Sequence, residues 1–263
     1  MILFVVPSHT MRETVLRVKS SLNIKAKPIF VTAVKGLEAV TNKRMSQIIQ
    51  DELGNEIESK VMALSGPSHA EEVSRKVPTA VVCAGSDKKN IEWVQHIFST
   101  NYFRVYASYD MIGVELGAAV KNIIAIAAGI LDGLGLGDNT KAALVTRGIK
   151  EIERLGVAQG AEPETFSGLS GIGDLVVTCF SKHSRNRFVG ENIGKGMKLN
   201  DILTSMIQVS EGVRTTQVVR KLADSLNLEM PITEKVYDVL FNDKPPRTAI
   251  EELMTRKLKF EVE

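Results

Sequence analysis

The sequence has few of the residues that mark a secreted or nucleic-acid-binding protein. It contains two cysteines, Cys83 and Cys179, which lie far apart. No disulfide framework is expected from them, and a reducing, cytoplasmic compartment is predicted. A net charge of +2 argues against a surface that binds nucleic acid, and the single tryptophan and four tyrosines form no platform for stacking bases. The four histidines show no metal-ligand spacing, so no metal site is expected.

Long hydrophobic runs are also scarce. The longest, from Leu116 to Leu131, contains Lys121 and has an acidic residue on either side. It is too short and too charged for a membrane span, so a buried helix is predicted and no membrane association is expected. The apolar opening, Ile2–Val6, lacks a basic start and is followed by Pro7, which favours a strand over a leader peptide.

The glycine fingerprint G-x-G-x-x-G, which holds a dinucleotide pyrophosphate at a helix N-terminus, is absent from the sequence. The run from Gly133 to Gly137 has a different spacing and follows a helical segment, so it is predicted to be a loop.

The first hundred residues alternate between short apolar runs and segments with a helical period. This alternation predicts a mostly parallel sheet covered by helices, a partial Rossmann-like α/β fold. The expected strands are Ile2–Val6, Pro28–Ala33, Val61–Leu64, Thr79–Ala84 and Phe103–Tyr106, and the expected helices are 10–22, 41–53 and 87–99.

After Asp110 no strand is predicted, and about seven helical segments follow. The chain is therefore expected to consist of residues 1–107, an α/β part, and residues 108–263, an all-α domain. Glycines and prolines suggest where its helices end and begin: breaks at Gly156, Gly173 and Gly190, and first-turn prolines at Pro231 and Pro246.

Lys121 lies among small and aliphatic residues, from Gly117 to Gly129. Burial there would disfavour the charged amine and lower its pKa, so that it could donate a proton to a carbonyl oxygen near neutral pH. Alternatively, the lysine lies at a helix edge and its amine reaches water. Asn122 beside it is either a polar partner or a cap.

An acid and a basic cluster follow in the second half. If a helix starts at Asp174, then Asp174 and Thr178 share a face, where the acid could hold an ammonium; as an alternative, it is an N-cap.

The basic cluster consists of Ser184, Arg185 and Asn186. It combines a helix-capping hydroxyl with a guanidinium and amide donors, which is typical of a phosphate site. A solvated basic turn is the alternative.

Two further candidates follow expected strands, where ligands of open α/β sheets bind. Lys35 and Gly36 come after one strand, and Ser65-Gly-Pro-Ser-His-Ala70 comes after the next. Either segment could instead be an ordinary turn.

These clusters occur together with other motifs in one order along the chain: Val-Pro-Ser, Thr-Ala-Val-Lys-Gly, Ser-Gly-Pro-Ser-His-Ala, Val-Glu-Leu-Gly-Ala-Ala-Val-Lys-Asn, Gly-Leu-Gly-Asp-Asn, Gly-Ile-Gly-Asp-Leu, Ser-Arg-Asn, Val-Ser-Glu-Gly and Met-Pro-Ile-Thr. In this combination the sequence resembles the bacterial-type NAD(P)-dependent glycerol-3-phosphate dehydrogenases over nearly its whole length.

The resemblance implies an oxidoreductase that interconverts dihydroxyacetone phosphate and glycerol 3-phosphate, the precursor of the phospholipid backbone. It implies NAD or NADP as cofactor, with NADPH the expected reductant, and a possible homodimer. Lys121 matches the catalytic proton donor and Asp174 the acid that accompanies it. The positions that match substrate contacts, together with their polar neighbours, are Lys35, Gly66, Ser68, Lys121, Asn122, Asp174, Thr178, Ser184, Arg185 and Asn186. Those that match cofactor contacts are Lys35, Ala70, Arg185, Val209 and Glu211.

The sequence departs from the family pattern at its start. Family members have a strand, the glycine fingerprint and further residues before the Val-Pro-Ser strand, whereas Met1 here falls inside that strand. The adenosine and pyrophosphate half of the cofactor site is therefore not encoded in this sequence, weak cofactor binding is expected, and the first strand should leave an uncovered sheet edge. A mis-assigned start, a shortened chain and a degenerate gene would each explain the departure.

Two other functions remain open at this point. One is a non-catalytic module that binds phosphorylated trioses without oxidising NAD(P)H. The other is a hydroxyacid dehydrogenase with a helical second domain.

Overall fold

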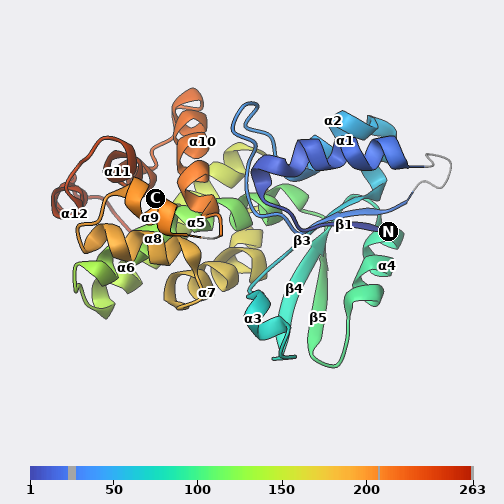
Figure 1. Cartoon of the computed structure of the whole chain (residues 1–263), viewed down its shortest axis with the longest axis horizontal. Helices are drawn as coiled ribbons and strands as arrows, with labels where there is room; N and C mark the ends of the chain where they lie inside the picture. The colour runs from blue at the N-terminus through green and yellow to red at the C-terminus, as the bar shows by residue number, and fades with distance from the viewer. Residues whose placement is uncertain (23–27, 207, 262–263) are drawn as a thin grey trace.

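The computed structural model describes residues 1–22, 28–206 and 208–261. One half of the molecule is a sheet with its helices, and the other half is helical (Figure 1). Five strands form the sheet in sequence order: β1 (Ile2–Phe4), β2 (Phe30–Thr32), β3 (Val61–Ser65), β4 (Thr79–Ala84) and β5 (Phe103–Ser108). Each overlaps an expected strand.

The sheet is mostly parallel, as predicted. Its neighbouring strands run parallel except for β3 and β4, which pair antiparallel with Leu64 opposite Cys83. β1 forms one edge and pairs only with β2 among the described residues. The expectation that β1 is buried holds for Phe4 but is wrong for Leu3, which is 41% exposed.

Helices cover the sheet on both sides. α1 (Met11–Ser21) and α2 (Met45–Leu53) lie over β1 and β2, where Phe4, Val15 and Ile48 belong to one apolar cluster. α4 (Lys88–Phe98) packs on the other side through Ile91 and Val94. Two short helices, η1 (Ser8–Thr10) and α3 (Ala70–Val73), follow β1 and β3, and η3 (Asn55–Lys60) precedes β3.

The helical half is built around α5 (Met111–Gly133). By length and composition this helix could cross a membrane, but 94% of its most apolar window is buried inside the structure, as predicted for a core helix. Around it lie α6 (Asp138–Ala158), η4 (Pro163–Ser167), η5 (Leu169–Gly173), α7 (Asp174–Phe180), α8 (Arg185–Gly194), α9 (Leu199–Ser205), α10 (Glu211–Ser225), α11 (Pro231–Phe241) and α12 (Pro246–Met254).

Two of the three expected glycine breaks are wrong. Gly173 directly precedes α7, but α6 continues through Gly156 and α8 through Gly190. A β-carbon on Gly190 would lie 1.9 Å from the backbone oxygen of Ile126, and one on Gly156 would lie 2.1 Å from the ring of Phe166. These glycines therefore permit close packing inside helices. Pro231 and Pro246 open helices, as expected.

A buried carboxylate joins two helices of this half. Glu151 on α6 accepts hydrogen bonds from the backbone nitrogens of Ile232 (2.6 Å) and Thr233 (3.1 Å) at the start of α11, and from the Thr233 hydroxyl. Burial raises the pKa of Glu151 to about 7, although these donors oppose the shift.

Glu151 should therefore make stability depend on pH. The native state holds this proton up to about pH 7, whereas the unfolded chain releases it near pH 4.5, so the free energy of unfolding should fall by about 3 kcal/mol as pH rises through that range. Glu151→Gln should flatten this dependence in urea unfolding at a series of pH values. Glu153→Gln, on the same helix at a surface ion pair with Lys150, should keep the wild-type slope; equal slopes in both variants would contradict the assignment.

Candidate active site

The amine of Lys121 lies in the interior, between the sheet and the helical half. The residue is only 4% exposed, so the alternative in which its amine reaches water is wrong. Its Nζ donates to Asp174 Oδ1 at 2.6 Å and to Thr178 Oγ1 at 2.6 Å. Burial lowers the pKa of Lys121 to about 8; the carboxylate of Asp174 opposes this shift, and the charge of Lys35 adds to it.

Asp174 is the centre of this group. It is the first residue of α7, one turn before Thr178, and the N-cap position belongs to Gly173 rather than to the acid. Its second oxygen, Oδ2, accepts from Lys35 Nζ at 2.7 Å. Although burial acts in the opposite direction, the two ammonium groups lower the pKa of Asp174 below its ordinary value. One fully buried carboxylate thus holds two lysines from different halves of the molecule.

Lys35 connects this group to the strand ends. Its Nζ also donates to the carbonyl oxygen of Gly66 at 2.9 Å, and that oxygen accepts from the Ser68 hydroxyl at 3.0 Å. Gly66 has φ +145°, and a β-carbon there would lie 2.9 Å from Val81 Cα, so the turn after β3 requires glycine. The Lys35 side chain is still 24% exposed and can reach a ligand.

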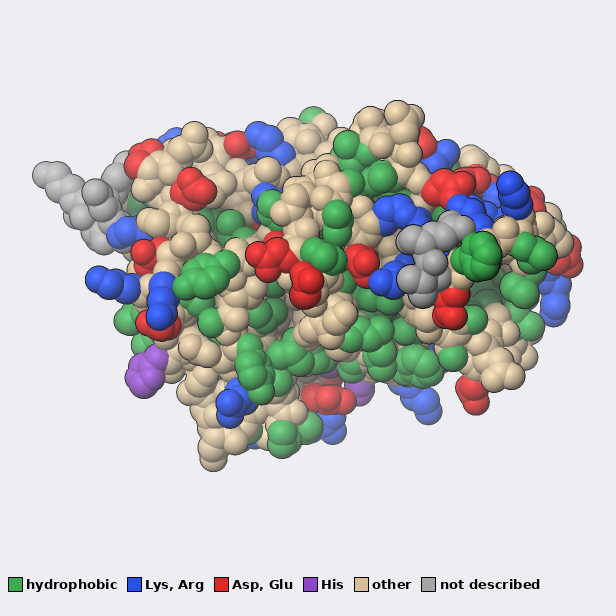
Figure 2. Space-filling model, turned by 180° about the vertical axis from the view of Figure 1, so that it is seen from behind, with side chains coloured by type: hydrophobic (Ala, Val, Ile, Leu, Met, Phe, Trp, Pro, Cys, Tyr) green, Lys and Arg blue, Asp and Glu red, His purple; other side chains and the backbone are tan. Residues whose placement is uncertain are grey.

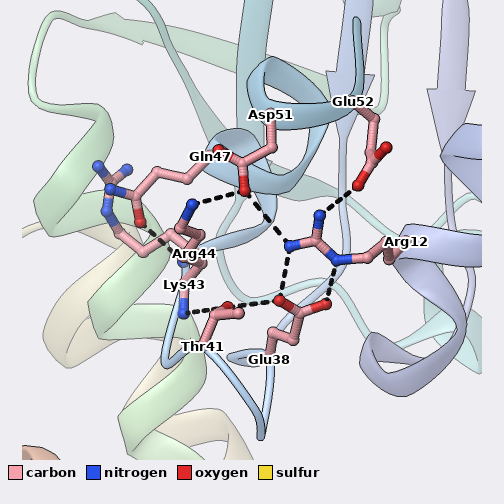
Figure 3. Close-up of polar contacts among 8 residues, drawn as sticks. All are labelled: Arg12, Glu38, Thr41, Lys43, Arg44, Gln47, Asp51 and Glu52. Carbon is pink, nitrogen blue, oxygen red and sulfur yellow. Dashed lines mark hydrogen bonds and ion pairs between the residues drawn. The ribbon is translucent and has the colours of Figure 1, made fainter.

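The loop that carries Lys35 is fixed by charged contacts (Figure 3). Arg12 on α1 forms two hydrogen bonds of 2.7 Å with the carboxylate of Glu38 and further ion pairs with Asp51 and Glu52 on α2. At the far end of the same loop, Arg44 pairs with the buried Glu115 of α5. The loop is therefore tied both to the sheet half and to the helix that carries Lys121.

A second polar group adjoins Lys121. Asn122 Oδ1 accepts from Asn186 Nδ2 at 2.9 Å, and Asn186 Oδ1 accepts from the Ser210 hydroxyl (2.7 Å) and the backbone nitrogen of Gly212 (2.8 Å). Asn122 is thus a polar partner of Asn186 and not a cap. Ser184 caps α8, as predicted, by accepting from the backbone nitrogen of Arg187.

The remaining expected site residues lie at the surface of this region. Arg185 is exposed and makes no hydrogen bond or ion pair within the described parts of the chain. Ala70 begins α3 and is exposed, and Val209 lies in the segment before α10. Glu211, at the start of α10, accepts from the backbone nitrogen and the hydroxyl of Ser8.

Two residues were not singled out from the sequence although both lie in quoted motifs. Ser8, in Val-Pro-Ser, ties the end of β1 to Glu211. His69, in Ser-Gly-Pro-Ser-His-Ala, has a buried Nε2 without a hydrogen-bond partner in the described residues, as does the hydroxyl of Ser65. Burial, followed by the charges of Lys121 and Lys35, lowers the pKa of His69. Spacing alone gave no signal for either residue, because their roles depend on partners distant in sequence.

Comparison with known proteins agrees with this geometry. Two family profiles match the chain: the NAD-dependent glycerol-3-phosphate dehydrogenase N-terminus over residues 1–91 and the C-terminus of the same family over residues 110–251. A glycerol-3-phosphate dehydrogenase [NAD(P)+] of Chlorobium luteolum is 53% identical, with 98% of this chain and 77% of the relative covered. One from Pediococcus pentosaceus is 52% identical over 100% of this chain and 78% of its own length.

A solved structure shows the same arrangement. The crystal structure of glycerol-3-phosphate dehydrogenase from Coxiella burnetii superposes with a TM-score of 0.91 at 40% identity, covering 97% of this chain and 77% of that one. Matches of this identity and coverage, in both halves of the molecule, show that the chain belongs to the NAD-dependent glycerol-3-phosphate dehydrogenase family.

Proposed function

We propose that this protein interconverts dihydroxyacetone phosphate and glycerol 3-phosphate with NAD(P)H, and that Lys121 exchanges the proton at the C2 oxygen. The buried Lys121–Asp174 pair carries the proposal. Asp174 and Thr178 orient the amine, while burial brings its pKa close to the working pH, where it can both give and take a proton. The carbonyl oxygen gains charge during reduction, and a positioned ammonium stabilises that charge.

The substrate phosphate is proposed to bind between Lys35, Arg185 and the first turn of α8. Arg185 offers an exposed guanidinium without a described carboxylate partner, and the Lys35 side chain is partly exposed. Asn122 and Asn186, which are hydrogen-bonded to each other, are proposed to complete the substrate site together with Gly66, Ser68, Thr178 and Ser184. These residues supply the donors that phosphate and hydroxyl oxygens require.

The described residues fit the nicotinamide end of the cofactor. The Ser65 hydroxyl and His69 Nε2, where β3 ends, are buried polar groups that have no hydrogen-bond partner among the described residues, and such groups need hydrogen bonds that a polar ligand could provide. We propose Lys35, Ala70, Arg185, Val209 and Glu211 as residues that would hold it. When bound, the cofactor supplies the hydride.

We further propose residues 1–107 as the remainder of the nucleotide-binding domain and 108–263 as the substrate-binding, catalytic domain. The change from strands to helices between Ser108 and Met111 supports this division. A cytoplasmic location, a homodimer and a role in supplying the glycerol phosphate of phospholipids are part of the same proposal; the two buried, unpaired cysteines are compatible with a reducing compartment.

The direct test is to add dihydroxyacetone phosphate and NADPH, or NADH, and to follow the nicotinamide absorbance. Oxidation that depends on the triose phosphate would support the proposal. If the folded protein binds the triose phosphate but does not oxidise NAD(P)H, it is a non-catalytic module instead. If NAD(P)H is oxidised with a 2-oxo acid and not with the triose phosphate, it is a different dehydrogenase.

The two directions of the reaction should depend oppositely on pH. Ketone reduction needs protonated Lys121, so its rate should fall as pH rises through about 8. Glycerol 3-phosphate oxidation needs the neutral amine, so its rate should rise over the same range. Measuring kcat in both directions between pH 6 and 10 checks this expectation; parallel profiles would contradict it.

A further inference from the structure

A cavity lies in the helical half, and no residue of the proposed active site lines it. It is open to solvent on one side, is lined mainly by α6, α11, α12 and residues 255–261, and has a volume of about 730 Å³. Cavities of this size commonly hold small molecules.

The walls of this cavity are largely apolar. Leu144 and Val157 line it from α6, Ile250, Leu253 and Met254 from α12, and Phe260 from the segment after α12. Three of these side chains remain strongly exposed: Val157 by 46%, Met254 by 77% and Phe260 by 83%. Exposed apolar side chains that face one cavity indicate a surface suited to a hydrocarbon group.

A row of cations borders the same cavity. Arg147, Lys150 and Arg154 follow one another on one face of α6 and all line it. Lys150 pairs with Glu153, whereas in the described part of the chain the two guanidinium groups donate to backbone carbonyls alone, Arg147 to Glu261 and Arg154 to Glu229. Four glutamates also line the cavity: Glu151, Glu153, Glu229 and Glu261. Glu153 pairs with Lys150, and Glu229 pairs with Arg256 and Lys259. Among the described residues, neither Arg147 nor Arg154 has a carboxylate within ion-pair distance, so these two guanidinium groups are the cations proposed to meet an anionic ligand. Figure 2 shows hydrophobic and basic side chains next to one another on the helical half of the molecule.

We propose that this cavity binds an amphipathic anion, a molecule with a hydrocarbon chain and a carboxylate or phosphate head. The chain would lie against α12 and the head would meet Arg147 and Arg154 on α6.

The test is titration calorimetry of the full chain with dodecanoate and dodecyl phosphate below their micelle concentrations, and with dodecanol below its solubility limit. Both anions should bind and dodecanol should bind at least tenfold more weakly; the ratio of the two anions tells whether a fatty acid or a phosphate monoester is preferred. Shortening the carboxylate should weaken binding by roughly fourfold per methylene, as expected for a chain that is fully buried. Equal binding of dodecanol, or no dependence on chain length, would overturn the proposal.

Variants separate this site from the rest of the protein. Arg147→Gln with Arg154→Gln should weaken dodecanoate binding about tenfold or more, whereas Arg17→Gln, on the exposed surface of α1, should leave it unchanged. Leu144→Trp would fill the cavity from α6 and should abolish binding. This variant tests the site independently if the arginine variant fails to fold. Lys121→Ala should bind dodecanoate as the wild type does, so the result does not depend on catalysis. Light scattering shows whether a second copy occupies the cavity instead. If no ligand binds, and the arginine variant forms a dimer more readily than the wild type does, a second copy is the occupant and the proposal is overturned.

Discussion

Replacing Lys121 by alanine should lower kcat for dihydroxyacetone phosphate reduction by roughly 10²- to 10⁴-fold, the range expected when a positioned proton donor is lost. KM for the triose phosphate should change much less, because Lys35 and Arg185 are proposed to hold the phosphate. The variant removes the amine that donates to Asp174 and Thr178. Steady-state kinetics in the reduction direction measure the effect.

Two controls distinguish lost chemistry from lost structure. Lys141 on α6 is also a buried lysine, but it pairs with Asp132 and not with Asp174. Lys141→Met should therefore retain kcat while showing a comparable loss of stability. Added primary amines should partly restore the activity of Lys121→Ala, because they can occupy the vacated space and donate the proton. Largely intact turnover in Lys121→Ala would show that another group protonates the ketone.

The sequence was sufficient to predict the elements of the fold. Short runs of β-branched residues such as Val61–Leu64 mark strands, because side chains of that kind suit a buried parallel sheet. The segment around Lys121 was predicted to be a buried helix, because its apolar residues surround the helix on all sides. Both features depend on local composition and are visible in one stretch of sequence.

The contacts of the site could not be predicted in the same way. Lys35 reaches Asp174 across 139 positions of the chain, and Ser8 reaches Glu211 across 203. The spacing of residues along the sequence does not show which residues so far apart will be in contact. The prediction of helix breaks at glycines was wrong for a related reason. Gly190 allows α8 to approach Ile126 on another helix, and the requirement for a glycine there can be recognised only when the partner helix is known. Family resemblance supplied the candidate residues, and the structure supplied their partners.

Replacing Asp174 by asparagine should reduce both stability and activity. The change leaves the ammonium groups of Lys35 and Lys121 without the carboxylate that both of them contact. Removing one partner of a buried ion pair typically costs about 3–5 kcal/mol, because an uncompensated charge remains. Urea unfolding at neutral pH measures this loss. The pKa of Asp174 is lowered in the native state, so its contribution to wild-type stability is present above its unfolded pKa and lost in acid. The difference between wild type and variant should therefore shrink as the pH falls.

The double variant Lys121→Met with Asp174→Asn separates the two roles of this pair. Removing the buried ammonium together with its carboxylate leaves a single lysine, Lys35, which is partly exposed and can turn to water. The double variant should then recover about half or more of the stability lost in Asp174→Asn. It should recover no activity, because the amine proposed to protonate the ketone, that of Lys121, is absent. Additive stability losses would mean that the two side chains do not interact in solution, and the proton-transfer assignment would then lose its structural basis.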